Sequence, residues 1–288
     1  MLKHATNLIR NVSNKAERTM NFTDNIKNHL SKYKEIYFPT LENGIWKKNK
    51  KPYSHILPES NKFDNLLEPY KNELENYISN HKIKTHTDFH HLNSSQAMCL
   101  NFFFPLFKEN KLDLVTEFLG FENEKVNYES VCFEKDGLEI KFGSRRPTSF
   151  DFYFKTISNK EFYFEIKYTE GEFGKAKLDI DKFNKFYSKS LNTINADFQK
   201  TELFFTNYQI LRNLIHIDDN SFVIFIYPKE NINIKKGADK VKMEFLVPKF
   251  QNNFHNVHWR NIFNNIAEKK GNESLIKQFA EFEKKYLP

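Results

Sequence analysis

Two neighbouring aromatic segments constrain the fold of this chain more than any other feature. Large apolar residues recur at every second position, and the turn-forming cluster Ser158-Asn159-Lys160 separates the two segments. Because successive side chains of a strand point to opposite faces, this period predicts the strands Ser149–Phe154 and Phe162–Tyr168, joined as a hairpin. One face would carry the apolar rows Phe150, Phe152, Phe154 and Phe162, Phe164, Ile166, Tyr168. The opposite face would gather Asp151, Glu165 and Lys167.

Other segments show either strand or helix periodicity. The nearly continuous apolar run Phe222–Tyr227 predicts a strand buried on both faces, and therefore a central one. Further strands are expected at Val126–Glu134, Leu138–Phe142 and Met243–Val247. Helices are expected at 61–80, from Asn93 or Ser94 to near Pro105, at 175–189, at 202–217, and at the end, where Leu275, Phe279, Phe282 and Tyr286 form one stripe. Mixing strands and helices in this order predicts a mixed α/β fold.

Charge and composition narrow the class of partner. The 288-residue chain carries a formal net charge of +7, which favours an anionic partner, above all nucleic acid, although a codon bias towards Lys explains the excess equally well. Candidate phosphate contacts lie in two basic loops, at Lys47, Lys48 and Lys50 and at Lys235 and Lys236. Two cysteines make no disulfide framework, which favours the cytoplasm. No apolar run approaches the ~18 residues of a membrane span.

The ionisable face of the hairpin suggests metal chemistry. Two carboxylates, Asp151 and Glu165, together with a backbone carbonyl offer the hard oxygen ligands that Mg²⁺ prefers. A held Mg²⁺ polarises a phosphodiester and lowers the pKa of bound water. Lys167 would orient or deprotonate that water and stabilise charge on the phosphate, and partial burial would lower its pKa. The alternative is a cross-strand ion pair on a solvent-exposed hairpin.

Four segments in order carry a resemblance to a known family. They are Ser94-Ser95-Gln96-Ala97 with Asn101-Phe102-Phe103 and Pro105-Leu106, Arg146-Pro147-Thr148-Ser149-Phe150-Asp151, Glu165-Ile166-Lys167-Tyr168-Thr169-Glu170, and Gln209-Ile210-Leu211-Arg212-Asn213-Leu214. Over roughly residues 90–230 the chain resembles the PD-(D/E)xK nuclease superfamily, in a branch of restriction endonucleases with the restriction-endonuclease-like fold. It departs from the motif because three residues separate Pro147 from Asp151.

The resemblance implies a role for each matched residue. Asp151 and Glu165 would be metal ligands with the Ile166 carbonyl, and Lys167 would be the catalytic lysine. An additional upstream acid would be Glu134, favoured over Glu129. Gln209 and Arg212 would reach the scissile phosphate, unless they lie on a solvated helix face.

These inferences predict a Mg²⁺-dependent or Mn²⁺-dependent endonuclease that cuts double-stranded DNA. The expected architecture is a mixed central sheet flanked by helices: a helical extension at 1–85, a nuclease core at 86–250 and C-terminal helices at 251–288. A homodimer is plausible, since cutting both strands at once requires two sites. The alternatives are a nucleic-acid-binding module without cleavage, a Mg²⁺ enzyme for a small phosphorylated substrate, and a structural protein.

Overall fold

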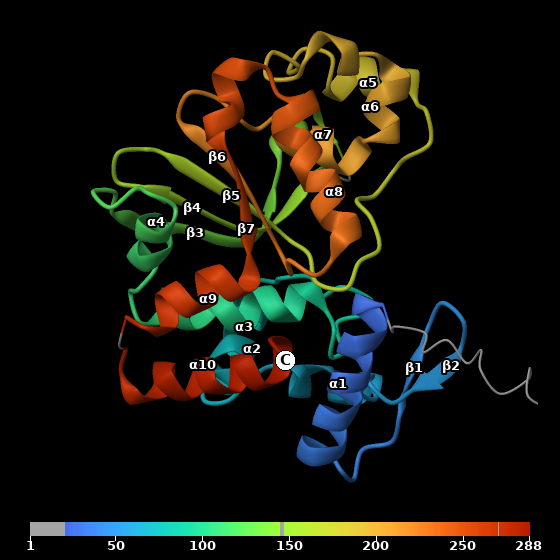
Figure 1. The fold of residues 1–288 in the computed structure, drawn as a ribbon, viewed down its shortest axis with the longest axis vertical. Coiled ribbons are helices and arrows are strands. Elements are labelled where there is room, and N and C mark those ends of the chain that lie inside the picture. The colour runs from blue at the N-terminus through green and yellow to red at the C-terminus, as the bar shows by residue number, and fades with distance from the viewer. Residues whose placement is uncertain (1–20, 145–146, 270) are drawn as a thin grey trace, which may run out of the picture.

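The computed structural model describes residues 21–144, 147–269 and 271–288; Arg146, which contributes to the resemblance, lies outside them. A five-stranded mixed sheet crosses the molecule in the order β3-β4-β5-β6-β7 (Figure 1). The strands span Val126–Asp136, Ser149–Thr156, Glu161–Ile166, Ser221–Tyr227 and Phe254–His258. Strands β3, β4 and β5 pair antiparallel, whereas β5, β6 and β7 pair parallel. The predicted mixed α/β class is confirmed.

Helices cover both faces of this sheet and enclose two hydrophobic cores (Figure 1). The core on one face includes residues of α1 (Phe22–Tyr37), α2 (Lys71–Asn80), α3 (Ser95–Lys108), α4 (Asp113–Phe118), α9 (Trp259–Ala267) and α10 (Glu273–Tyr286). Helices α3 and α9 lie against the strands, and α10 packs on α3. The other face packs against α5 (Ile180–Phe186), α6 (Thr201–Thr206), α7 (Tyr208–Leu214) and α8 (Ile232–Lys240). Strand β6 is buried throughout, because its alternate residues enter the two cores in turn. It lies inside the sheet, as predicted.

The N-terminal segment contains a small hairpin. The basic segment Trp46–Tyr53 was expected to be a loop, but its ends form β1 (Gly44–Trp46) and β2 (Lys51–Tyr53), which pair antiparallel. Trp46 packs edge-on against Tyr53, with ring centroids 5.9 Å apart. Gly44 is needed here, since a Cβ on it would lie 1.9 Å from the Leu57 carbonyl oxygen. The hairpin has little apolar alternation, so its sequence resembles that of a solvated loop.

Several segments have a different type of secondary structure from the one predicted. Residues Leu138–Phe142 form a 3₁₀-helix, not a strand, and it is Glu139 that is buried while Ile140 and Phe142 stay exposed. The second basic loop contains helix α8, whose buried Ile234 and Ala238 are spaced i, i+4. Met243–Val247 is not a strand, because residues Val241–Phe245 form a π-helical turn. Strand β7 was not predicted from the sequence.

Other elements have different bounds. The expected helix over 61–80 is a 3₁₀-helix (Glu59–Asn65) followed by α2, with Pro69 between them. Helix α3 continues through Pro105. The expected helix over 175–189 begins only at Ile180, after the N-cap Asp179, and the one over 202–217 breaks at Asn207 into α6 and α7. The C-terminal stripe is buried in α10, as predicted. No described helix is long and apolar enough to span a bilayer.

Candidate active site

The predicted hairpin separates at Asp151. The last paired residues of β4 and β5 are Phe152 and Phe164. Beyond them, a hydrogen bond to the Asp151 side chain replaces the pairing between the two backbones. The Asp151 Oδ2 accepts the Ile166 backbone N–H at 2.6 Å. Phe150 lies in the second core against Tyr163, with ring centroids 4.9 Å apart, whereas Phe152 lies in the first. The prediction that Phe150 shares a face with Phe152 and Phe154 is therefore wrong, and the change occurs at Asp151, where the backbone pairing of β4 with β5 ends.

Glu165 and Lys167 form a buried ion pair on β5 and the residue that follows it. Lys167 Nζ lies 2.8 Å from Glu165 Oε1, and the two side chains are 9% and 5% exposed. Helix α7 supplies two further donors to the carboxylate: Gln209 Nε2 at 2.7 Å and Asn213 Nδ2 at 3.0 Å. Residues four apart lie on one face of a helix, so both amides point at the same carboxylate. The structure thus joins Glu165, Lys167 and Gln209 as one polar group.

The charge state of Lys167 differs from the expectation. Burial lowers the pKa of its amine, but the carboxylates of Glu165, Glu170 and Asp151 outweigh this effect and raise the pKa above the ordinary value. Burial thus acts in the predicted direction, but the predicted fall of the lysine pKa is wrong. Glu170 contributes because it lies close to the turn after β5, where its Oε2 accepts the Tyr168 N–H at 2.6 Å. Lys167 is consequently a fixed positive charge at neutral pH.

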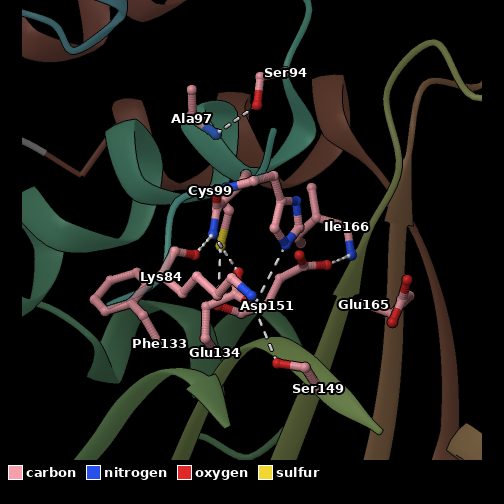
Figure 2. Close-up of polar contacts among 12 residues, drawn as sticks. Lys84, Ser94, Ala97, Cys99, Phe133, Glu134, Ser149, Asp151, Glu165 and Ile166 are labelled. Atoms are coloured by element: carbon pink, nitrogen blue, oxygen red, sulfur yellow. Dashed lines mark hydrogen bonds and ion pairs between the residues drawn. The ribbon is translucent and has the colours of Figure 1, made fainter. Parts of the chain in front are cut away.

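Asp151 lies in a strongly acidic environment. Desolvation, followed by the negative charges of Glu165 and Glu134, raises its pKa well above the ordinary range, although the residue keeps some contact with solvent. In Figure 2, Asp151 and Glu134 lie together beneath the start of α3, and Glu165 lies apart from them. Without a bound cation, a carboxylate in such surroundings is hard to ionise. A cation placed next to it stabilises the ionised form. Asp151 is therefore suited to hold a cation or a proton.

Glu134 is the candidate upstream acid that the structure brings to Asp151. Its backbone has a φ of 54°, a left-handed conformation uncommon outside glycine. Gln96 Nε2 donates to its Oε1 at 2.7 Å, Ser149 Oγ donates to its Oε2 at 3.0 Å, and His86 Nε2 lies 3.6 Å from Oε2. By contrast, the other candidate, Glu129, is exposed. These contacts join α3, β3 and β4 around one carboxylate (Figure 2).

The donor set fits a hard divalent cation that retains water. A carboxylate has about four acceptor positions, and three donors reach that of Glu165, so one position remains. Asp151 gives up one position to the Ile166 N–H. No group of three or more His, Cys, Asp and Glu side chains in the described part of the chain has the arrangement of a metal centre. Mg²⁺ is usually bound by only one or two carboxylates together with water and substrate phosphate, so a third acidic side chain is not required.

The remaining candidate on α7, Arg212, lies elsewhere. Arg212 stacks over the Tyr208 ring, with its guanidinium carbon 5.1 Å from the ring centroid. His216 follows the end of α7 and is buried, and its Nε2 accepts the Leu138 N–H at 2.8 Å. The structure therefore brings Gln209 to the carboxylate but does not join Arg212 to it by any contact that it describes.

The predicted phosphate contacts divide between two places. Lys47, Lys48 and Lys50 are exposed on the connection between β1 and β2, where Lys47 pairs with Glu59 at 2.5 Å and Lys48 lies over Trp46. On α8, Lys236 is exposed, whereas Lys235 pairs with Asp239 at 2.5 Å. Three of the five lysines thus have no ion pair with an acid among the described residues.

Sequence reasoning missed two residues of this polar network. Asn213 was read only as part of a matching segment, although its spacing of four residues from Gln209 was the signal that both face one target. His86 was not assigned to this network, because it lies in a segment without regular structure, where no periodicity indicates its direction.

Comparison with known proteins gives one match. A family model described as "Restriction Endonuclease associating with ARP" matches residues 27–287. The match extends well beyond the 90–230 over which a resemblance was expected, and it includes the N-terminal hairpin and the C-terminal helices. No curated protein and no solved structure matches the chain.

Proposed function

We propose, from the premise that the chain belongs to the family of restriction endonucleases associating with ARP, that it is a divalent-metal-dependent DNA endonuclease. Its active site would be the place where β4 and β5 separate. Asp151, Glu165 and Lys167 would carry the reaction, with the Ile166 carbonyl as a further ligand and Glu134 as the additional acid.

One observation supports this assignment most strongly: the buried Glu165–Lys167 pair beside a second carboxylate. Burying ions costs several kcal/mol each, and apolar residues of similar volume often fill such a site at no loss of stability. The Asp151 carboxylate adds repulsion that lowers stability further. A group that reduces stability in this way is typical of a site kept for its chemistry.

Each residue has a definite task in the proposed reaction. The bound cation would polarise the scissile phosphate and lower the pKa of a water molecule. Asp151 and Glu165 would hold that cation through carboxylate oxygens, and Gln209 and Asn213 would keep the Glu165 carboxylate in one orientation. Lys167 stays protonated, so its task would be to stabilise negative charge developing on the phosphate, without removing a proton from water.

The substrate contacts extend beyond the site. We expect Lys47, Lys48 and Lys50 on the hairpin, and Lys235 and Lys236 on α8, to contact DNA phosphates and to make binding weaken as salt rises. A homodimer would bring two sites to the two strands of a duplex.

The proposal is tested by offering the full chain, with Mg²⁺ or Mn²⁺, long duplex DNA of varied sequence, single-stranded DNA, RNA and p-nitrophenyl phosphate. Cleavage of DNA by the wild-type protein, absent from Lys167→Met and retained by the exposed control Lys155→Met, would support it. Hydrolysis of p-nitrophenyl phosphate alone would indicate a small-substrate enzyme. DNA binding without cleavage of any nucleic acid would indicate a binding module, and either outcome would overturn the proposal.

A further inference from the structure

A cavity of about 500 Å³ lies beside the candidate active site. The β1–β2 hairpin forms one wall, the segment from His86 to Ser95 another, and the turn after β5 closes it at Thr169 and Glu170. Two of these residues connect it to the site: His86 contacts Glu134, and Glu170 raises the pKa of Lys167. A volume of this size is within the range of pockets that hold small organic ligands.

Aromatic rings make up a large part of the lining. Trp46 meets Tyr53 and His91 edge-to-face, with ring centroids 5.9 Å and 6.3 Å apart, and Tyr53 meets His55 in the same way at 5.7 Å. In an edge-to-face pair, one ring offers its edge only, so its own faces are not covered by the partner ring. One face of Trp46 instead meets the exposed Lys48 amine, 5.6 Å from the ring centroid. Trp46 and Tyr53 are only partly buried, so a ligand has access to them.

Two buried polar atoms in the lining have no hydrogen-bond partner among the residues that the structure describes. His91 is 7% exposed, and its Nε2 makes no hydrogen bond, the nearest carboxylate oxygen being Asp88 Oδ1 at 3.5 Å. The Asn93 Oδ1 is buried without a donor, while its Nδ2 donates to Thr169 Oγ1 at 2.7 Å. Buried polar atoms of this kind favour a ligand that carries hydrogen-bonding groups.

We propose that this cavity binds one unpaired nucleobase of the DNA substrate, stacked on the Trp46–Tyr53 wall and hydrogen-bonded by its edge to Asn93. The inference rests on the proposed function, because it specifies how that substrate is held next to the cleavage site. Aromatic stacking beside a basic surface is a general means of binding single-stranded nucleic acid. Here the exposed lysines of the hairpin follow directly after Trp46.

The charges of the lining favour a base over a phosphate. The lining contains one lysine, Lys27, and two acids, Asp88 and Glu170. Burial lowers the pKa of His55 and of His91 to about 4, so both rings are neutral at pH 7. His86 also lines the cavity, and the neighbouring Glu134 raises its pKa. The lining thus holds two basic and two acidic groups among its aromatic rings, so it has no excess of positive charge to attract an anion but accepts a flat, uncharged heterocycle. The phosphates would then remain outside, along the lysines.

The chain itself provides a reporter for this test. It has two tryptophans, of which Trp259 is fully buried and Trp46 lines the cavity. The four deoxynucleoside monophosphates and deoxyribose 5-phosphate are titrated into the full chain in EDTA, while tryptophan emission is recorded. No metal is present, so the result is independent of cleavage. We expect nucleotides to quench the tryptophan emission saturably, and the Trp259→Phe variant to show the same quenching. We expect no quenching by the sugar phosphate.

Variants of Tyr53 separate stacking from the folding of the hairpin. The Tyr53 hydroxyl accepts a hydrogen bond from Asn49 Nδ2 at 2.6 Å, and Tyr53→Phe removes this bond but keeps the ring. We expect Tyr53→Ala to weaken nucleotide binding about tenfold or more, and Tyr53→Phe to retain it. Equal quenching by deoxyribose 5-phosphate, or no quenching by any nucleotide, would overturn the base pocket. DNA cleavage by the same protein would show that the proposed nuclease survives this failure.

Discussion

Removing both partners of the Glu165–Lys167 ion pair is predicted to destabilise the protein by less than the sum of the two single removals. At 2.8 Å and an effective dielectric constant of about 20, Coulomb's law gives an attraction of about 6 kcal/mol, which offsets the cost of burying the two charges. Glu165→Gln leaves the buried amine without its anion, and Lys167→Met leaves the buried carboxylate without its cation. Each should lower the free energy of unfolding by about 3–5 kcal/mol. The double variant should lose about 2–3 kcal/mol less than the sum.

The assay is urea unfolding of the four proteins at neutral pH without divalent metal. The pair Lys155–Glu161 is the matched control, since it has the same 2.8 Å separation in the same sheet but side chains 41% and 24% exposed. Its coupling should not exceed about 1 kcal/mol. All three variants at Glu165 and Lys167 should lose DNA cleavage, and the control variants should keep it. Additivity at the buried pair within about 0.5 kcal/mol would refute the reasoning.

Three further predictions follow from named contacts. Asp151→Asn keeps an acceptor for the Ile166 N–H and removes the repulsion from Glu165 and Glu134, so without metal it should be as stable as the wild type or more stable by about 1–2 kcal/mol. Mg²⁺ should raise the melting temperature of the wild type only, and an equal rise in the variant would disagree with this. Asn213→Ala removes a donor to a buried carboxylate and should cost about 1.5–3 kcal/mol of stability in urea, and an unchanged midpoint would argue against the contact. Burial lowers the pKa of the Lys285 amine in the folded protein well below its ordinary value. At a pH between this lowered pKa and the pKa of the unfolded chain, the amine is protonated only in the unfolded chain. The free energy of unfolding therefore rises with pH in this window. Within this window, the free energy of unfolding of the wild type should therefore rise with pH by up to about 1.4 kcal/mol per pH unit relative to that of Lys285→Met. Parallel pH profiles of the two proteins would contradict the prediction.

The period of two in the aromatic segments was sufficient to predict the centre of the sheet. The apolar rows of β5 and β6 enter the cores that their alternation predicts, because both strands are buried along their length. The grouping of Glu165 with Lys167 followed from the same rule. The alternation of apolar residues predicts which side chains are buried together wherever the strand is regular.

The same rule fails where tertiary structure interrupts a strand. Phe150 changes core because Asp151 replaces the backbone ladder with a side-chain bond, which no pattern of apolar residues reveals. Leu138–Phe142 alternates like a strand, yet Glu139 is the buried residue, because its Oε1 accepts the Thr148 hydroxyl at 2.5 Å. Strand β7 has only Phe254 and Val257 as apolar anchors, so its alternation is too weak to recognise.

The most direct test of the central claim is nicking of supercoiled plasmid as Mg²⁺ is titrated, with wild type and Asp151→Asn compared side by side. The variant keeps the Ile166 contact, so a loss of activity reports on the carboxylate and its cation. We predict nicking that rises with Mg²⁺, is abolished by EDTA and is absent from the variant. Nicking by Asp151→Asn at the wild-type rate, or by wild type in EDTA, would contradict the proposed metal-dependent site.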